Sequence, residues 1–238
     1  MLKDLWNDGP LGTTSPYRPP TLHKYPLPPE HTNDEHFHHL RSMMDQIPRG
    51  AFVEPALDTT PSDESRFHPL SDGQVLTGEG VALRIIHTPG HTADSICIHL
   101  PEDGALFTAD SVLGHGTAVF EDLSEYLSSL HSLFDMNYGE TGLKALYPGH
   151  GPVLEGDAAR GTLQMYINHR KEREQQLVEV LQSKEMDWRV DDILAAVYPE
   201  HVRMMARRGV ILHLEKLERE KRVSRIQGEQ ESWRRLDR

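Results

Sequence analysis

Short apolar runs separated by turn residues fill the middle of the chain and predict a β-sheet. Runs of this length bounded by Gly, Pro or Asp are typical of strands. They predict strands over residues 74–77, 81–87, 95–100, 105–108 and 143–147. The segments Gly78-Glu79-Gly80 and Glu102-Asp103-Gly104 have the composition of hairpin turns, so the first four strands should form two antiparallel pairs.

Apolar residues at helical spacing predict helices after these strands. Residues 120–136 carry one apolar face, and the same spacing predicts helices over residues 158–184, 187–197 and 199–222. Two short strands are expected over residues 223–226 and 232–236. Two helices followed by a two-stranded wing resemble a winged helix. The pattern therefore predicts an α/β domain over residues 1–182 and a small winged-helix-like α+β domain over residues 183–238.

The first part of the chain predicts little regular structure. Residues 9–72 form a long Pro-rich insertion with one short strand at 21–25 and a short helix at 35–46, and a helix end is expected over residues 1–8. The segment His31–His39, HTNDEHFHH, is the densest histidine cluster. We interpret it as a solvated polar segment, because a Pro-flanked insertion offers no rigid element to hold metal ligands.

The candidate chemistry lies where three of the expected strands end. An apolar run, a Pro-Gly turn and a histidine occur in this order twice, before His91 and before His150, and Asp110 follows the strand at 105–108. Two imidazoles and a carboxylate suit Zn²⁺, Mn²⁺ or Fe, and three ligands with open positions are typical of catalytic sites. A carboxylate between two imidazoles can also bridge two metals, which together lower the pKa of a shared water.

Composition excludes several alternatives. The chain has 15 His but a single Cys, so Cys97 cannot form an internal disulfide, and its place in an alternating strand predicts a buried thiol. The expected location is cytoplasmic, because no apolar run is long enough to span a membrane and the first residues have neither a signal-peptide nor a transit-peptide pattern. Residues 1–160 hold 9 Lys and Arg against 23 Asp and Glu, a charge balance that disfavours nucleic acid as a substrate.

Four segments carry a resemblance to a known family. HTPGHTADS, LFTADSVLGHGTAVFEDLSEYLSSL, LYPGHGPVL and YINHRKEREQQ resemble the metallo-β-lactamase superfamily, and within it the branch of β-lactamase-like protein 2 and the fungal enzymes that release polyketides from carrier proteins. The resemblance covers about residues 73–182 and continues more weakly through HLEKLEREKRV.

The resemblance implies an αββα sandwich and a site with two Zn²⁺ ions. His91 would bind the first ion, Asp110 would bridge both and act in catalysis, and His150 would bind the second; His115 matches no family ligand. The implied function is a metal-dependent thioesterase that releases an acyl or polyketide chain, with an acyl carrier protein or a small acyl thioester as partner. No membrane partner is expected. The alternative is an endoribonuclease on single-stranded RNA, favoured by a basic wing that contains Lys221, Arg222, Arg225, Arg234 and Arg235.

The chain departs from the family pattern in one respect. The family motif His-x-His-x-Asp-His, which supplies four ligands, does not occur in the sequence, and His36-Phe37-His38-His39 does not match it. Two explanations compete: the sequence is a fragment of a complete enzyme whose first sheet is N-terminally incomplete here, or it is a short form that has lost catalysis. In both cases, we expect this chain alone to be inactive and to hold substoichiometric zinc.

Overall fold

The computed structural model describes residues 21–28, 67–78, 80–183, 187–226 and 232–236. The chain divides into one compact unit up to Leu70 and another from Ser71 onward. In the first unit, β1 (His23–Lys24) pairs in parallel with β2 (His68–Pro69), a partner strand that the sequence did not predict. The helices expected over residues 1–8 and 35–46, and the cluster His31–His39, lie outside the described residues.

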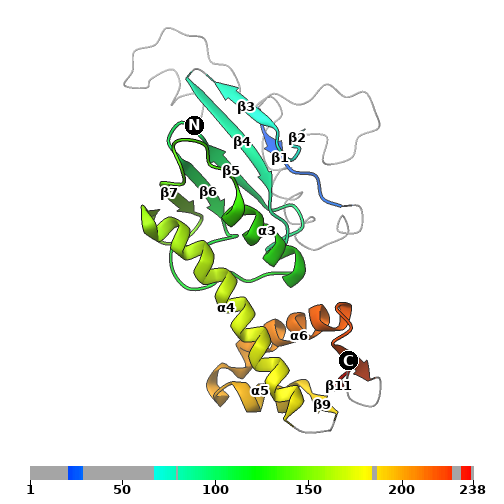
Figure 1. Ribbon diagram of the computed structural model, residues 1–238. Coiled ribbons are helices and arrows are strands. Elements are labelled where there is room, and N and C mark those ends of the chain that lie inside the picture. Colours follow the sequence, from blue (N-terminus) through cyan, green and yellow to red (C-terminus); the bar gives the residue numbers. More distant parts are fainter. Residues whose placement is uncertain (1–20, 29–66, 79, 184–186, 227–231, 237–238) are drawn as a thin grey trace, which may run out of the picture. The chain divides into compact units, whose positions relative to one another are not determined.

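The second unit contains a six-stranded mixed sheet in the order β3-β4-β5-β6-β7-β8. Its strands β3 to β7 are labelled in Figure 1. Its strands are β3 (Val75–Gly78), β4 (Val81–His87), β5 (Ile96–Leu100), β6 (Ala105–Ala109), β7 (Ala145–Pro148) and β8 (Leu154–Glu155). All neighbouring pairs are antiparallel except β6 and β7. Strands β4, β6 and β7 therefore run in one direction, and their carboxyl ends lie at the same edge. The predicted strands are confirmed, and β8 is an addition.

The helices α3 (Leu123–Asp135) and α4 (Asp157–Gln182) pack against one face of this sheet. Leu106 and Leu146 from the strands, Leu123 and Leu130 from α3, and Leu163 from α4 are fully buried together. The predicted start of the first helix at residue 120 was wrong by three residues. Asp122 caps the helix instead, because its side chain accepts hydrogen bonds from the backbone of the first turn.

The C-terminal part is built on two helices and a small sheet. It contains β9 (Trp188–Arg189), α5 (Val190–Val197), the 3₁₀ turn η3 (Glu200–Val202), α6 (Arg203–Arg219), β10 (Val223–Ile226) and β11 (Ser232–Arg235). The three strands pair in the order β10-β11-β9, which confirms the predicted wing. The helix predicted from residue 187 begins only at Val190, since Trp188 pairs with Trp233 of β11.

The long helix α4 contributes to two apolar cores. Leu163 and Ile167 lie in the core beneath the sheet, whereas Leu177 and Leu181 pack with Trp233 in the core of the C-terminal part. Between these two groups of α4 residues, Glu174 accepts hydrogen bonds from Lys216 (2.7 Å) and Arg222 (2.9 Å). A boundary between domains at residues 182 and 183 stays a prediction. Within the described ranges, no helix has the length and apolar character needed to cross a membrane.

Candidate metal centre

His91 lies in the loop that follows β4. Its backbone is positioned by the packing of Gly90 against α3, and its ring is positioned by a contact with Val119. Gly90 adopts φ 129°, a conformation that side chains rarely adopt, and a Cβ there would collide with the backbone of Tyr126 in α3. The His91 Nδ1 atom is 2.9 Å from the carbonyl oxygen of Val119, so Nδ1 carries the proton and donates to that carbonyl. This tautomer leaves the lone pair on Nε2, the atom that faces Asp110, and metal-binding histidines are usually held in this way.

Asp110 follows β6 at a strained point of the backbone. The pairing of β6 with β7 shifts register between Phe107 and Ala109, and Ala109 adopts φ 44°. A positive φ at a residue with a Cβ costs free energy, and such residues concentrate at functional sites. The Oδ1 atom of Asp110 is buried and has no hydrogen-bond partner within the part of the chain that the structure describes. A desolvated carboxylate oxygen of this kind is costly unless a cation or a donor offsets it.

His150 follows β7 and is placed over Asp110 by a tight turn. The Gly149 N–H donates to the carbonyl oxygen of Ala109 (2.8 Å), and a Cβ at Gly149 would lie 2.6 Å from Oδ1 of Asp110. The carbonyl oxygen of His150 accepts a hydrogen bond from the Gly114 N–H (2.9 Å). Only a glycine at position 149 therefore lets the turn approach the carboxylate this closely.

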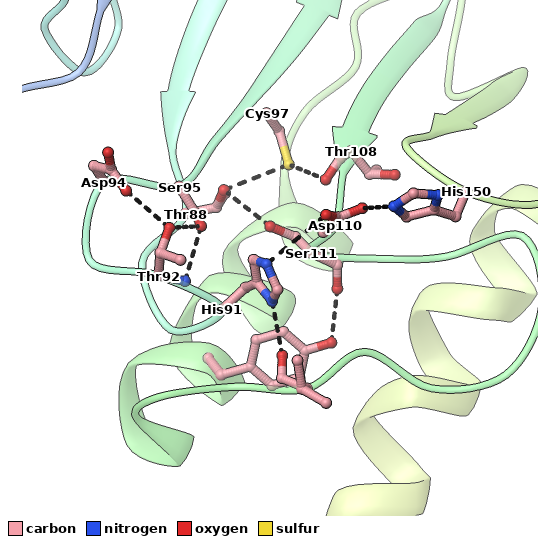
Figure 2. A network of polar contacts seen from close by, with 12 residues as sticks. Thr88, His91, Thr92, Asp94, Ser95, Cys97, Thr108, Asp110, Ser111 and His150 are labelled. Carbon is pink, nitrogen blue, oxygen red and sulfur yellow. Dashed lines mark hydrogen bonds and ion pairs between the residues drawn. The ribbon is translucent and has the colours of Figure 1, made fainter. Parts of the chain in front are cut away.

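The three predicted residues meet at one sheet edge (Figure 2). Nε2 of His91 is 3.9 Å from Oδ2 of Asp110, and Nε2 of His150 is 3.5 Å from Oδ1. Two donor atoms bound at about 2.0–2.1 Å to one tetrahedral zinc ion would be about 3.3 Å apart. The spacing fits metal coordination, with each imidazole facing a different carboxylate oxygen. Among the described residues, however, no group of three or more His, Cys, Asp or Glu is arranged closely enough to hold a metal ion as the side chains stand.

Two buried tyrosines that the sequence did not mark as part of the site support the loops around it. Tyr126 donates to the carbonyl oxygen of Ser111 (2.6 Å), next to Asp110. The hydroxyl of Tyr166 accepts from the Leu113 N–H (3.0 Å) and contacts the carbonyl of Gly116 (3.2 Å). Their helical spacing indicated core positions, and nothing in the sequence marked the role of their hydroxyls.

Cys97 is a buried strand residue, as predicted. Its side chain is fully buried, and Thr88 Oγ1 lies 3.5 Å from its Sγ atom (Figure 2). Burial raises the pKa of this thiol to about 11, although hydrogen bonds from Thr88 and Ser111 act in the opposite direction. A thiol with such a pKa is protonated near neutral pH and is a poor nucleophile or metal ligand.

The arginines of the predicted basic wing are largely neutralised. Arg222 pairs with Glu174 and Glu220, Arg225 pairs with Glu215 and Glu218, and Arg234 forms two hydrogen bonds with Asp187. Cations that are paired with carboxylates of the same chain attract a phosphate backbone weakly. These ion pairs make the wing a weaker candidate for binding nucleic acid than its sequence indicated.

A mixed sheet covered by helices, with two histidines and an aspartate at the carboxyl ends of co-directional strands, is the arrangement that the structure presents at this edge. The chain belongs to the metallo-beta-lactamase superfamily, whose family model matches residues 13–154. A second model, the beta-lactamase associated winged helix domain, matches residues 190–233. Both matches confirm the predicted fold class, and members of the superfamily typically bind zinc.

Curated relatives match part of their own length. A beta-lactamase-like protein 2 homolog of Drosophila melanogaster is 41% identical over 159 residues, which are 65% of this chain and 52% of that protein. An atrochrysone carboxyl ACP thioesterase of Aspergillus fumigatus is 40% identical over 124 residues, which are 50% of this chain and 37% of that protein. The chain thus spans about half the length of the Drosophila relative and about a third of the length of the Aspergillus relative.

A solved structure shares the fold. A metallo-beta-lactamase family protein from Thermus thermophilus aligns with a TM-score of 0.61 at 23% sequence identity, over 91% of this chain and 72% of that one.

Proposed function

We propose that this chain carries part of the active site of a metal-dependent thioesterase, with His91, Asp110 and His150 as metal ligands. The observation that carries the proposal is the position of Asp110. Each of its carboxylate oxygens faces one imidazole, at 3.9 and 3.5 Å, and its buried Oδ1 has no hydrogen-bond partner in the described part of the chain. With this arrangement, Asp110 would hold zinc together with the two histidines, and the bound metal would supply Lewis acidity.

The residues of the chain would hold and orient the site. The Val119 carbonyl fixes the tautomer of His91, so that its Nε2 lone pair is available as a ligand. Gly149 keeps the space beside Asp110 open, and Asp110 would supply negative charge to bound metal ions. When bound, zinc ions supply Lewis acidity, which lowers the pKa of water and polarises a carbonyl group.

A thioester is the substrate class we favour. One relative is named as an ACP thioesterase, which supports an acyl chain on a carrier protein, or a small acyl thioester, as the group cleaved. The acidic balance of residues 1–160 disfavours RNA, and the arginines of the wing are engaged with carboxylates. The endoribonuclease therefore stays the second candidate.

Zinc binding tests the ligand set without requiring turnover. We would measure the affinity of the purified chain by competition with a chromophoric chelator. Asp110→Asn and His150→Ala should each weaken binding by about tenfold or more, since each removes one ligand. Asp103→Asn and His115→Ala are matched controls and should leave the affinity unchanged. The ligand assignment would be overturned if the Asp110 and His150 variants bound zinc as tightly as the controls.

Substrate class needs a separate assay. Because the four-ligand family motif does not occur in this sequence, turnover is best measured on the gene product that carries this chain together with any in-frame His-x-His-x-Asp-His segment upstream. Hydrolysis of an acyl N-acetylcysteamine thioester that is lost in Asp110→Asn would support the proposal. Cleavage of single-stranded RNA without thioester hydrolysis, also lost in Asp110→Asn, would replace it with the second candidate.

A further inference from the structure

A cavity of about 420 Å³ lies between the loop 117–120, helix α4 and helix α6. It is distinct from the candidate metal centre, and its lining contains no Asp or Glu. Five of the lining side chains are basic or imidazole groups: His169, Arg170, Arg173, Arg208 and His213. Such a lining is unusual in a chain whose formal net charge is −12.

The three arginines of the cavity lack the carboxylate partners that other arginines in this part of the chain have. Within the described residues, no Asp or Glu lies at ion-pair distance from Arg170, Arg173 or Arg208. By contrast, Arg207, which directly precedes Arg208 in α6, pairs with Asp191. The cavity therefore concentrates positive charge that no carboxylate of the described residues neutralises.

Arg170 is the most buried of the three, with 7% of its surface exposed. Its Nη2 donates to the carbonyl oxygen of Ala118 (2.6 Å), and its guanidinium lies 4.7 Å from the centre of the Phe120 ring. Its buried Nε has no hydrogen-bond partner among the described residues. A nearly buried guanidinium with an unused donor is costly, unless an anion binds in the cavity.

His213 provides a second unsatisfied group. It is 1% exposed and lines the same cavity, and its Nδ1 atom has no hydrogen-bond partner in the described part of the chain. Burial, followed by the nearby charges of Arg170, Lys216, Arg173 and His169, lowers its pKa to about 3. The imidazole is therefore neutral near neutral pH, where it can donate or accept one hydrogen bond at Nδ1.

We propose that this cavity binds an organic oxyanion, a phosphate or a carboxylate carried on an apolar body. Arg170, Arg173 and Arg208 supply the charge, because guanidinium groups match both anions in geometry. Val202, Met205 and Leu212 line the cavity with apolar surface, and its volume exceeds what a free inorganic ion needs. Two sources share this chemistry: the phosphate of a pantetheine arm and the carboxylate of a released acyl chain.

The cavity shares a loop with the candidate metal centre. Ala118 and Val119 both line it, and their carbonyl oxygens accept from Arg170 and from His91, respectively. An occupant would thus contact the segment that orients His91. The choice of these two sources rests on the proposed function, but the anion site itself is tested by binding, so its failure can be told apart from a failure of the proposed hydrolysis.

Gly209 is a position where a substitution can change the charge of the cavity wall. It lies in α6 on the cavity wall, and a Cβ there would meet no atom within 4 Å. We would measure binding to the full chain by calorimetry, using 4′-phosphopantetheine against pantetheine and 2-naphthoate against 2-naphthamide. At least one anion should bind about tenfold or more tightly than its neutral counterpart, and less tightly as salt is raised.

Gly209→Glu should weaken binding of that anion by about tenfold, whereas the isosteric Gly209→Gln should leave it within about twofold. Arg208→Gln should also weaken binding, and Arg207→Gln, its paired neighbour on the same helix, should not. Preference for phosphopantetheine would identify the phosphate as the source, and preference for naphthoate the carboxylate. Equal binding of charged and neutral probes, no binding of either anion, or equal affinities of the Glu and Gln variants would overturn the proposal.

Discussion

Asp122 accepts three hydrogen bonds at the start of α3. Different replacements of Asp122 should remove either all three bonds or only the bond from Arg219, so their effects on stability can be told apart. Its Oδ1 accepts from the backbone N–H groups of Ser124 (2.8 Å) and Glu125 (3.0 Å). Its Oδ2 accepts from Nη1 of Arg219 in α6 (2.7 Å). One carboxylate thus caps a helix and links the sheet-covering helix to the C-terminal part.

The two functions have different magnitudes. Loss of an Asp N-cap costs about 1 kcal/mol of the free energy of unfolding. The ion pair is discounted, since the Arg219 side chain is half exposed, and contributes about 0.5 kcal/mol within a range of about 0–1. Asp122→Ala should therefore cost about 1.5 kcal/mol. Asp122→Asn keeps the capping oxygen and should cost about 0.5 kcal/mol, as should Arg219→Gln.

The sign of the pH dependence follows from the pKa of Asp122. Burial raises this pKa, but the hydrogen bond from Arg219 and those from the backbone of Glu125 and Ser124 outweigh burial and lower it below 3.8. A carboxylate whose pKa is depressed by folding stabilises the folded state above its unfolded pKa. The difference in stability between the wild-type chain and Asp122→Asn should be constant above about pH 5 and disappear as the pH falls through the folded pKa.

Urea denaturation followed by circular dichroism measures these differences, and the Asp122→Ala/Arg219→Gln double mutant supplies the coupling energy. A coupling of about 0.2–1 kcal/mol is expected. The reasoning would be refuted if Asp122→Asn were as destabilising as Asp122→Ala, because the cap would then carry none of the difference.

Three further outcomes are expected. Gly90→Ala should lower the free energy of unfolding by more than about 2 kcal/mol in thermal denaturation, because its Cβ would collide with Tyr126; a near-neutral effect would contradict the close approach. Trp233→Ala should cost about 3–5 kcal/mol and abolish the near-ultraviolet dichroism of this buried ring, which also packs against Arg225. Cys97 should resist a thiol reagent near neutral pH until urea unfolds the chain, and rapid labelling of the native protein would disprove its burial.

The apolar pattern was sufficient to predict the strands and most helices, because burial on one face imposes a regular spacing on the sequence. It failed where a polar contact sets a boundary. Phe120 continues the apolar face of α3, yet the helix starts at Leu123, because Asp122 satisfies the backbone donors of the first turn. Trp188 likewise reads as helical, but its partner Trp233 lies far along the chain and places it in β9.

The sequence predicted which three side chains lie together, whereas the contacts that support them were not predictable; their role as metal ligands stays a prediction. The repeated Pro-Gly-His pattern and the strand-end aspartate identify His91, Asp110 and His150 from the sequence, and the structure brings them to one edge. The carbonyl of Val119 that orients His91 carries no sequence signal, because any residue supplies a backbone carbonyl. The same holds for the positive φ of Ala109, since alanine gives no indication of a left-handed backbone conformation.

Helix α4 limits how this architecture can be rearranged by recombination. Its first half packs beneath the sheet through Leu163 and Ile167, and its last turns supply Leu177 and Leu181 to the core that encloses Trp233. A gene fusion that exchanged only the residues after α4 would place a new wing against Leu177 and Leu181, which pack with the residues of the original wing. We therefore expect a transplanted C-terminal part to fold on a new host only when it keeps the last turns of α4.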